Sequence, residues 1–149
     1  MIKIEQANVE DTPAIVAFQL AMALETEELR LDPPMVQQGV NAVFNDPGKG
    51  FYLVARDGNK LISSLMITYE WSDWRAKTVW WIQSLYVLPE YRQQGIFRQM
   101  FDWLSRLARE AGTVGGIRLY VDNRNMSARA VYEALGMDGE HYRFYELMF

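Results

Sequence analysis

The sequence predicts an α/β (α+β) domain with a mixed sheet whose antiparallel part comes first along the chain. Strand-like and helix-like segments interleave throughout, with no internal repeat and no linker. Asp57-Gly58 is a hairpin signal between two apolar strands. A strand over 78–88, a helix over 95–111 and a strand over 117–121 form a βαβ crossover. The two strands of a crossover are parallel and lie next to or near each other.

The first half of the chain predicts a strand, two helices and a hairpin. Thr12 supplies a side-chain oxygen that can cap a helix, and Pro13 suits the first helical turn because its missing N–H is not needed there. Pro33-Pro34 opens a second helix, which Asn45-Asp46-Pro47-Gly48 closes. The elements expected here are a strand at 2–6, helices at 12–28 and 33–45, and strands at 51–55 and 60–69.

The second half of the chain predicts alternating strands and helices. Apolar residues recur at helical spacing from Gly95 to Ala111, and Gly112 ends that helix. Asn125 or Ser127 caps a short helix. The elements expected here are a strand at 78–88, a helix at 95–111, a strand at 117–121, a short helix reaching 135, and a closing strand at 142–149.

Composition excludes several classes of protein. A length of 149 residues predicts one domain, 1–149. The net charge of −4 argues against nucleic-acid binding, which needs a basic surface. No cysteine and a single histidine exclude thiolate metal sites, a cysteine nucleophile and paired-histidine metal motifs, so no metal is expected. Neither a signal peptide nor a membrane span is recognisable, which predicts a cytoplasmic protein.

One stretch suggests an anion site. Residues 85–98, LYVLPEYRQQGIFR, combine a strand end, a proline turn, a polar segment ending at Gly95 and the start of a helix. Backbone N–H groups and the positive end of the helix dipole then converge beyond the strand, as a pyrophosphate requires. Arg92 and Arg98 add positive charge. Taken alone, this spacing equally fits a helix start with exposed arginines.

A second stretch, residues 123–137 (NRNMSARAVYEALGM), follows about 30 residues later. Together the two resemble the acyl-CoA-binding core of the GNAT superfamily of N-acetyltransferases. In that family a strand, Pro-Glu-Tyr-Arg, a glycine loop and a long helix precede Asn-x-x-Ala-x-x-x-Tyr-x-x-x-Gly. The match covers residues 78–137. The resemblance implies a mixed, mostly antiparallel central sheet with a βαβ acyl-CoA-binding core and helices on both faces.

The resemblance also implies acetyl-CoA as acyl donor and a homodimer. Backbone groups at the end of the third sheet strand would pair with the pantetheine arm, and an N–H there would face the thioester carbonyl. Tyr132 would contact the donor and protonate the leaving thiolate as general acid. The residues implied to contact acetyl-CoA are Leu85, Tyr86, Val87, Arg92, Gln93, Gln94, Gly95, Phe97, Arg98, Asn125 and Tyr132. Val131 and Leu135 form the apolar pair of the last helix, which places Tyr132 on its flank.

Two positions depart from the family pattern. Phe97 stands where the family usually has Gly or Ala, so its side chain must point away from the ligand. Gln83 stands where a glutamate often acts as base, and an amide cannot accept a proton at neutral pH. Water, Glu70, Asp73 or Glu28 could take that role, although the sequence favours a solvated surface position for each of these carboxylates taken singly.

The resemblance implies that the first two helices and the hairpin loop near residue 73 border the acceptor site. Carboxylates beside aromatic rings suit a cationic amine. The residues concerned are Glu25, Glu27, Glu28, Asp32, Trp71, Asp73 and Trp74.

The sequence therefore predicts transfer of an acetyl group from acetyl-CoA to a primary amine, a small cationic one, by direct attack in a ternary complex. A non-catalytic acyl-CoA-binding or sensor domain is the alternative, supported by Gln83 and opposed by Tyr132. A phosphate or nucleotide binder unrelated to coenzyme A would rest on residues 92–95 alone.

Overall fold

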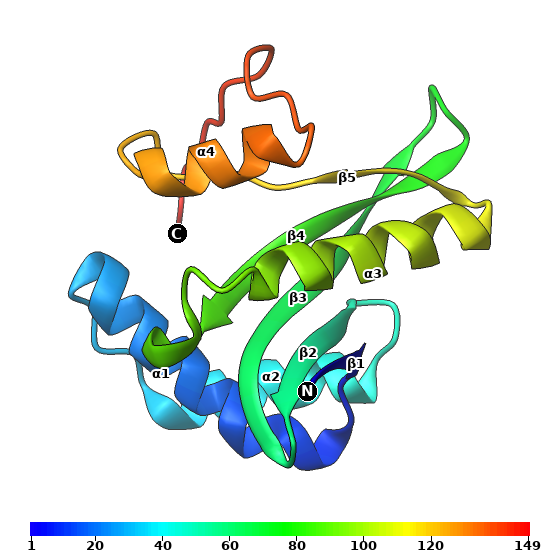
Figure 1. The fold of residues 1–149 in the computed structure, drawn as a ribbon. Coiled ribbons are helices and arrows are strands. Elements are labelled where there is room, and N and C mark those ends of the chain that lie inside the picture. Colours follow the sequence, from blue (N-terminus) through cyan, green and yellow to red (C-terminus); the bar gives the residue numbers. More distant parts are fainter. The chain divides into compact units, whose positions relative to one another are not determined.

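The computed structural model describes all residues, 1–149, as two compact units, 1–118 and 119–149, and each unit is described by itself. Helices and strands of the first unit follow the predicted order (Figure 1). They are β1 (Ile2–Gln6), α1 (Thr12–Glu27), α2 (Pro33–Asn45), β2 (Phe51–Asp57), β3 (Lys60–Ser72), β4 (Lys77–Val87), α3 (Ile96–Ala111) and β5 (Val114–Arg118). Single 3₁₀ turns stand at Val9–Asp11 and Pro89–Tyr91.

The first unit is built on one five-stranded sheet in the order β1-β2-β3-β4-β5. The first four strands are antiparallel neighbours, and β4 and β5 are parallel. Asp57 pairs with Lys60 across the tight hairpin that Asp57-Gly58 predicts. The mixed sheet and the βαβ crossover are therefore confirmed.

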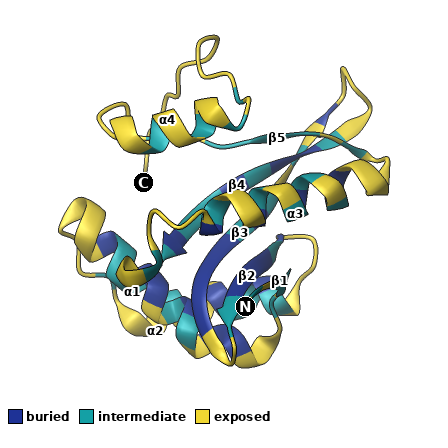
Figure 2. Cartoon of the chain, in the orientation of Figure 1, coloured by how far each residue is buried: buried dark blue, intermediate teal, exposed yellow.

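Helices cover both faces of this sheet (Figure 1). On one face, α1 and α2 contribute Ile15, Phe18 and Val40 to a buried cluster with Tyr52 and Val54 of β2. On the other face, Met100 and Leu104 of α3 are fully buried, and the hydroxyl of Ser63 on β3 lies 3.2 Å from the Met100 sulfur. The buried residues of β2 and β3 form the centre of the unit (Figure 2).

The position of β5 differs from the sequence prediction of 117–121. The strand runs from Val114 to Arg118, and its second and third residues, Gly115 and Gly116, carry no apolar signal. Pairing defines it instead: Thr78 lies opposite Val114, and the Thr78 N–H donates to the Thr113 carbonyl at 3.0 Å. The ends of a strand depend on its hydrogen bonds to the neighbouring strand, and the local side-chain pattern does not specify these in full.

The second unit holds one helix, α4 (Met126–Ala134). Asn125 caps it as predicted, because its side-chain oxygen accepts from the Ala128 N–H at 3.1 Å. The predicted strand over 142–149 is wrong: no helix or strand follows α4. Alternating polarity specifies which face a residue would take in a strand, but a strand forms only where a partner supplies the hydrogen bonds.

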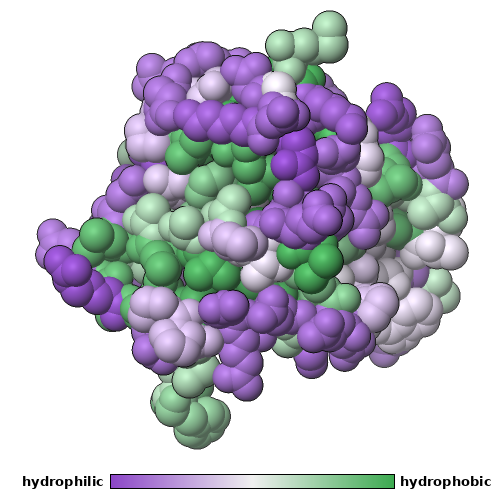
Figure 3. Space-filling model, turned by 90° about the horizontal axis from the view of Figure 1, so that it is seen from below, coloured by the Kyte–Doolittle hydropathy of each residue, from purple (hydrophilic) through white to green (hydrophobic).

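Apolar side chains also reach the surface. Figure 3 shows them, in green, between polar and charged groups on the face seen from below. Scattered exposed apolar groups are ordinary for a folded protein.

No helix combines the length and apolar character that crossing a membrane requires.

Candidate functional site

A β-bulge interrupts β4 near its end. Met66 on β3 pairs with Gln83 and Ser64 pairs with Tyr86, so two residues, Ser84 and Leu85, oppose one. Ser84 has a left-handed backbone, φ 53°, which is uncommon outside glycine and typical of functional strain. The ladder between β4 and β5 ends at Trp81, so no strand pairs with this edge beyond it. The bulge and the unpaired edge together offer backbone hydrogen-bonding groups to a ligand.

The helix that follows the bulge starts without a side-chain cap. Gly95 precedes α3 with φ 74°, and Gln93 is also left-handed, φ 59°. The first N–H groups of an uncapped helix have no partner within the helix and attract an anion. The Phe97 ring lies 6.0 Å from the Phe101 ring, so it packs along the helix surface. The aromatic side chain at 97 is therefore compatible with an anion at the backbone of this turn.

Arg92 is fixed against its neighbours. Its Nε donates to the Val87 carbonyl at 2.9 Å, its Nη2 donates to Glu25 at 2.8 Å, and its guanidinium lies 5.4 Å from the Tyr86 ring centre. The Tyr86 hydroxyl donates to the other Glu25 oxygen at 2.9 Å. The Arg92 hydrogen bond is the largest cause that lowers the pKa of Glu25. Arg92 thus joins the loop to α1, while Arg98 is exposed on the first turn of α3.

The turn before this loop is fastened to the β2–β3 hairpin. The Tyr91 hydroxyl donates to Asp57 at 2.9 Å, and Lys60 pairs with Glu90 at 2.8 Å. Gln94 donates from its side chain to the Glu90 carbonyl at 2.7 Å. Two of these contacts join the turn to the β2–β3 hairpin, which lies about 30 residues earlier in the chain, and the third lies within the loop. Together they fix the position of the loop.

The face of β4 that carries Gln83 is polar. Gln83 donates to the Thr68 hydroxyl on β3. Further along the same face, Glu70 accepts from the Trp81 indole N–H at 2.7 Å and from Arg118 at 2.9 and 3.0 Å. The Trp81 hydrogen bond, followed by Arg118, lowers the pKa of Glu70. A carboxylate so stabilised in its charged form is a weaker base than an ordinary glutamate.

Glu28 and Glu70 share no hydrogen-bond or ion-pair partner. Glu28 follows α1 as an exposed residue with a left-handed backbone, φ 52°. The hairpin tryptophans are also distant from the carboxylates of α1: Trp71 pairs with Thr78, whereas Glu25 contacts Tyr86, eight residues or about 26 Å along β4. The structure therefore does not bring the aromatic and acidic halves of the predicted acceptor site together.

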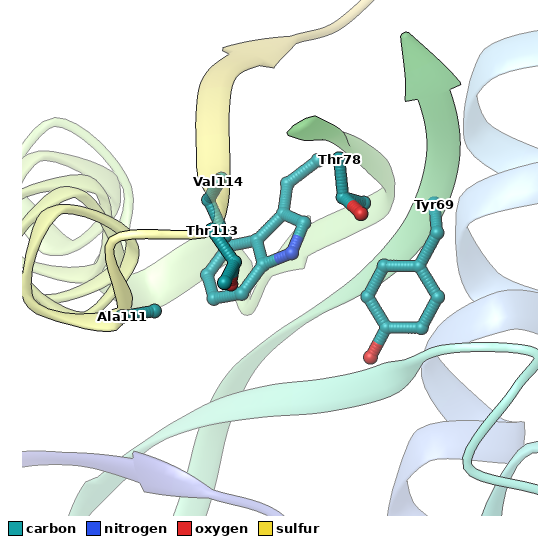
Figure 4. Close-up of a pocket in the computed structure, with 6 residues that line it drawn as sticks. Tyr69, Thr78, Ala111, Thr113 and Val114 are labelled. Atoms are coloured by element: carbon teal, nitrogen blue, oxygen red, sulfur yellow. The ribbon is translucent and has the colours of Figure 1, made fainter. Parts of the chain in front are cut away.

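A separate hollow of about 320 Å³ lies beyond the end of α3 (Figure 4). It is on the opposite face of β4 from Gln83, because Trp80 lines it and successive residues of a strand alternate. Its lining residues are Tyr69, Thr78, Trp80, Ala111, Thr113 and Val114. None of the residues predicted to bind acetyl-CoA lines it.

Tyr132 and Asn125 belong to the second unit. Burial raises the pKa of Tyr132, which further favours the protonated phenol over the phenolate, and a general acid acts from its protonated form. Val131, expected to be the apolar partner of Leu135, is exposed instead.

Sequence reasoning missed Thr68, Arg118 and the partners of Arg92. Thr68 and Glu70 lie two residues apart in a strand, so period-two alternation could have placed them on one face with Gln83. The bond from Arg92 to Glu25 spans 67 positions, and no local pattern indicates it.

Comparisons with known proteins agree with this geometry. The model of the Acetyltransferase (GNAT) family matches residues 16–137. A curated relative, the aminoalkylphosphonate N-acetyltransferase of Salmonella typhimurium, is 28% identical over 95% of this chain and 88% of its own. The crystal structure of a possible acetyltransferase from Clostridium difficile 630 is 39% identical, covers 100% of this chain and 98% of its own, and has a TM-score of 0.92. A predicted acetyltransferase from Clostridium acetobutylicum, solved with acetyl-CoA, is 19% identical over 98% of this chain and 96% of its own, with a TM-score of 0.75, and shares the fold.

Proposed function

We propose, because the chain belongs to the acetyltransferase (GNAT) family, that this acyltransferase moves an acetyl group from acetyl-CoA to the nitrogen of a small primary amine. The observation that carries the proposal is the bulge at Ser84 and Leu85, which leads into the uncapped start of α3. A thioester carbonyl and a pyrophosphate need these two kinds of backbone site in this order.

Acetyl-CoA fits the residues of the first unit. The pantetheine arm would extend along Leu85, Tyr86 and Val87, where the edge of β4 has no paired strand. The pyrophosphate would accept from the backbone of the glycine loop and the first turn of α3. The residues proposed around it are Gln93, Gln94, Gly95, Phe97 and Arg98, with Arg92 holding the loop. Asn125 and Tyr132 would complete the site, so the proposal treats residues 1–149 as one functional domain.

The chemistry is direct aminolysis of the thioester. The unprotonated amine attacks the carbonyl carbon, a C–N bond forms, and the C–S bond breaks. A backbone N–H at the bulge stabilises the negative charge that develops on the oxygen. The attacking nitrogen gives its proton to water, and the Tyr132 phenol gives one to the departing thiolate. No covalent enzyme intermediate is needed, and the chain has no cysteine to form one.

The acceptor is proposed to be a small aliphatic amine, cationic in solution. The curated relative is named for aminoalkylphosphonates, which carry such an amine. The nitrogen attacks in its unprotonated form, and binding that holds it beside the thioester lowers the entropic cost of the encounter.

A homodimer is proposed as well. Six large apolar side chains between residues 142 and 149 are at least 59% exposed. They are Tyr142, Phe144, Tyr145, Leu147, Met148 and Phe149. Exposed apolar side chains gathered in one segment are typical of a protein–protein interface. Light scattering on the intact chain should give twice its mass, and Leu147→Glu should shift it toward the monomer.

Calorimetric titration with acetyl-CoA, with ATP as the anion control, tests the proposed function. Micromolar affinity for acetyl-CoA and much weaker binding of ATP is the expected result. A screen of primary amines that follows thiol release then measures turnover. Equal affinity for both ligands, or no thiol release with any amine, would contradict the proposal.

A further inference from the structure

One carboxylate at the end of α1 has a different partner on each of its oxygens. Glu25 Oε1 accepts from the Tyr86 hydroxyl at 2.9 Å, and Glu25 Oε2 accepts from Arg92 Nη2 at 2.8 Å. The Arg92 guanidinium lies 5.4 Å from the centre of the Tyr86 ring, so the two partners also contact each other. We call these three residues the Glu25 cluster.

The two partners of Glu25 belong to different parts of the donor site. Tyr86 lies on β4 and directly follows the bulge at Ser84 and Leu85. Arg92 opens the loop that leads to the uncapped start of α3, and its Nε donates to the Val87 carbonyl at 2.9 Å. The Glu25 cluster therefore joins the strand end proposed for the thioester and the pantetheine arm to the loop proposed for the pyrophosphate.

The helix that carries Glu25 is a rigid support. Ile15 of α1 is fully buried, and Phe18 of α1 is 6% exposed. The Phe18 ring lies 5.2 Å from the ring of Tyr86, so α1 contacts this tyrosine at its ring as well as at its hydroxyl. Closely packed side chains leave a helix little freedom to move against its sheet. The position of the Glu25 carboxylate is thus set by the core.

The span between the two parts of the donor site matters because coenzyme A carries both contact groups in one molecule. Its pyrophosphate and its thioester lie at opposite ends of the pantetheine arm. Once one end is bound, the effective concentration of the other end depends on how well the span between the sites matches the linker. The charges of Glu25 and Arg92 are paired with each other, so a contribution of the Glu25 cluster to affinity comes through this span.

We propose that Glu25 is a positioning residue for the acyl donor: it holds Tyr86 and Arg92 in the relative placement that one coenzyme A molecule spans. This inference rests on the proposed function, since it concerns the donor site of the same reaction. It assigns Glu25 to the donor, whereas the sequence predicts this residue on the acceptor side.

Three variants that cut the link at different points test the inference. Tyr86→Phe removes only the hydroxyl contact at the strand end. Glu25→Gln keeps an oxygen for that hydroxyl and loses the charge-assisted contact with Arg92. Glu25→Ala removes both contacts. A link in series fails when either joint is cut, so each variant should raise the Kd for acetyl-CoA by about fivefold, the effect of one partly exposed ion pair.

Non-additivity and a matched control complete the binding test. The double variant Glu25→Ala/Tyr86→Phe should bind acetyl-CoA no more weakly than Glu25→Ala, because both changes break the same link. Glu110→Ala removes an exposed glutamate from the last turn of α3 and should leave the Kd unchanged. Calorimetry measures each Kd, and thermal unfolding shows that each variant is folded. Tyr86→Phe removes a single oxygen atom and so tests the link with the smallest change to the core.

Steady-state kinetics separates a positioning role from a general loss of structure. With an amine that the screen identifies, Glu25→Ala should raise the KM for acetyl-CoA and change kcat by less than about twofold, because saturating donor restores the bound state. If no amine is acetylated, the proposed function fails, and the Kd comparison still decides the inference.

Two results would overturn the inference and leave the proposed function standing. One is an acetyl-CoA affinity in Glu25→Ala equal to that of the wild type, with thiol release retained. The other is a loss confined to one joint: if Tyr86→Phe binds as the wild type does, Glu25 acts on the loop alone, and if Glu25→Gln does so, Glu25 acts on the strand alone.

Discussion

Arg92 donates from Nη2 to Glu25 Oε2 at 2.8 Å, and this ion pair joins the loop before α3 to the last turns of α1. The side chain of each partner is about two-fifths exposed. The pair therefore contributes little to stability, at most about 1 kcal/mol. Its consequence is positional: a residue expected to face the pyrophosphate is directed to a helix instead.

The first prediction concerns the pKa of Glu25. Its folded-state pKa is lowered below the ordinary 4.5, chiefly by the Arg92 hydrogen bond. A lowered carboxyl pKa means that the stabilisation is present above about pH 4.5 and is lost as the pH falls through the folded-state value. Carbon-detected NMR titration should find the Glu25 midpoint below 4.5 in the wild type and close to it in Arg92→Gln. The same midpoint in both proteins would show that the pair does not persist in solution.

The second prediction separates the two arginines of the loop. Arg98→Ala should raise the Kd for acetyl-CoA about tenfold at low salt, and this difference should shrink as the ionic strength rises. Arg92→Ala should also weaken binding, but with little change in its salt dependence, because the charge of Arg92 is already paired with Glu25. Calorimetry at two salt concentrations measures both effects. If Arg92→Ala reduced the salt dependence of binding more than Arg98→Ala does, the charge of Arg92 would act on the ligand and not on Glu25.

The third prediction concerns Tyr132. Tyr132→Phe removes only the phenol oxygen, so kcat should fall about 100-fold while the Kd for acetyl-CoA changes little. Steady-state kinetics and calorimetry measure the two quantities. Tyr69→Phe is the matched control, because Tyr69 is 41% exposed and lines the hollow that none of the residues predicted to bind acetyl-CoA lines. Full activity in Tyr132→Phe would remove the general-acid assignment.

Local signals in the sequence account for much of the fold. Thr12-Pro13, Pro33-Pro34 and Gly112 mark helix boundaries that the structure confirms, because backbone conformation depends on a few neighbouring residues. The predicted cap by Thr12 is wrong: Thr12 is the first residue of α1, its hydroxyl donates to the Val9 carbonyl at 2.7 Å, and no side chain caps this helix. The glycine loop at Gly95 was predictable for the same reason. These features need no knowledge of distant parts of the chain.

Long-range pairing accounts for the rest. The bulge at Ser84 arises from the register between β3 and β4, and the contact of Glu70 with Arg118 spans 48 positions. The predicted strand over 142–149 is wrong for the same reason, since its pattern could not name a partner. Glu70, predicted from the sequence as a candidate base, is a weaker base in the structure because its carboxylate accepts from Trp81 and Arg118.

The fourth prediction concerns Gly50, which precedes β2. A Cβ atom added there would lie 1.9 Å from the Ile67 carbonyl oxygen of β3, and the glycine has φ 148°. Because backbone atoms cannot yield as a flexible side chain does, Gly50→Ala should lower the free energy of unfolding by about 3 kcal/mol. Gly116→Ala is the control, since no atom lies within 4 Å of its added Cβ. Urea unfolding of both variants measures the difference, and equal midpoints would mean that the β2–β3 pairing adjusts at no cost.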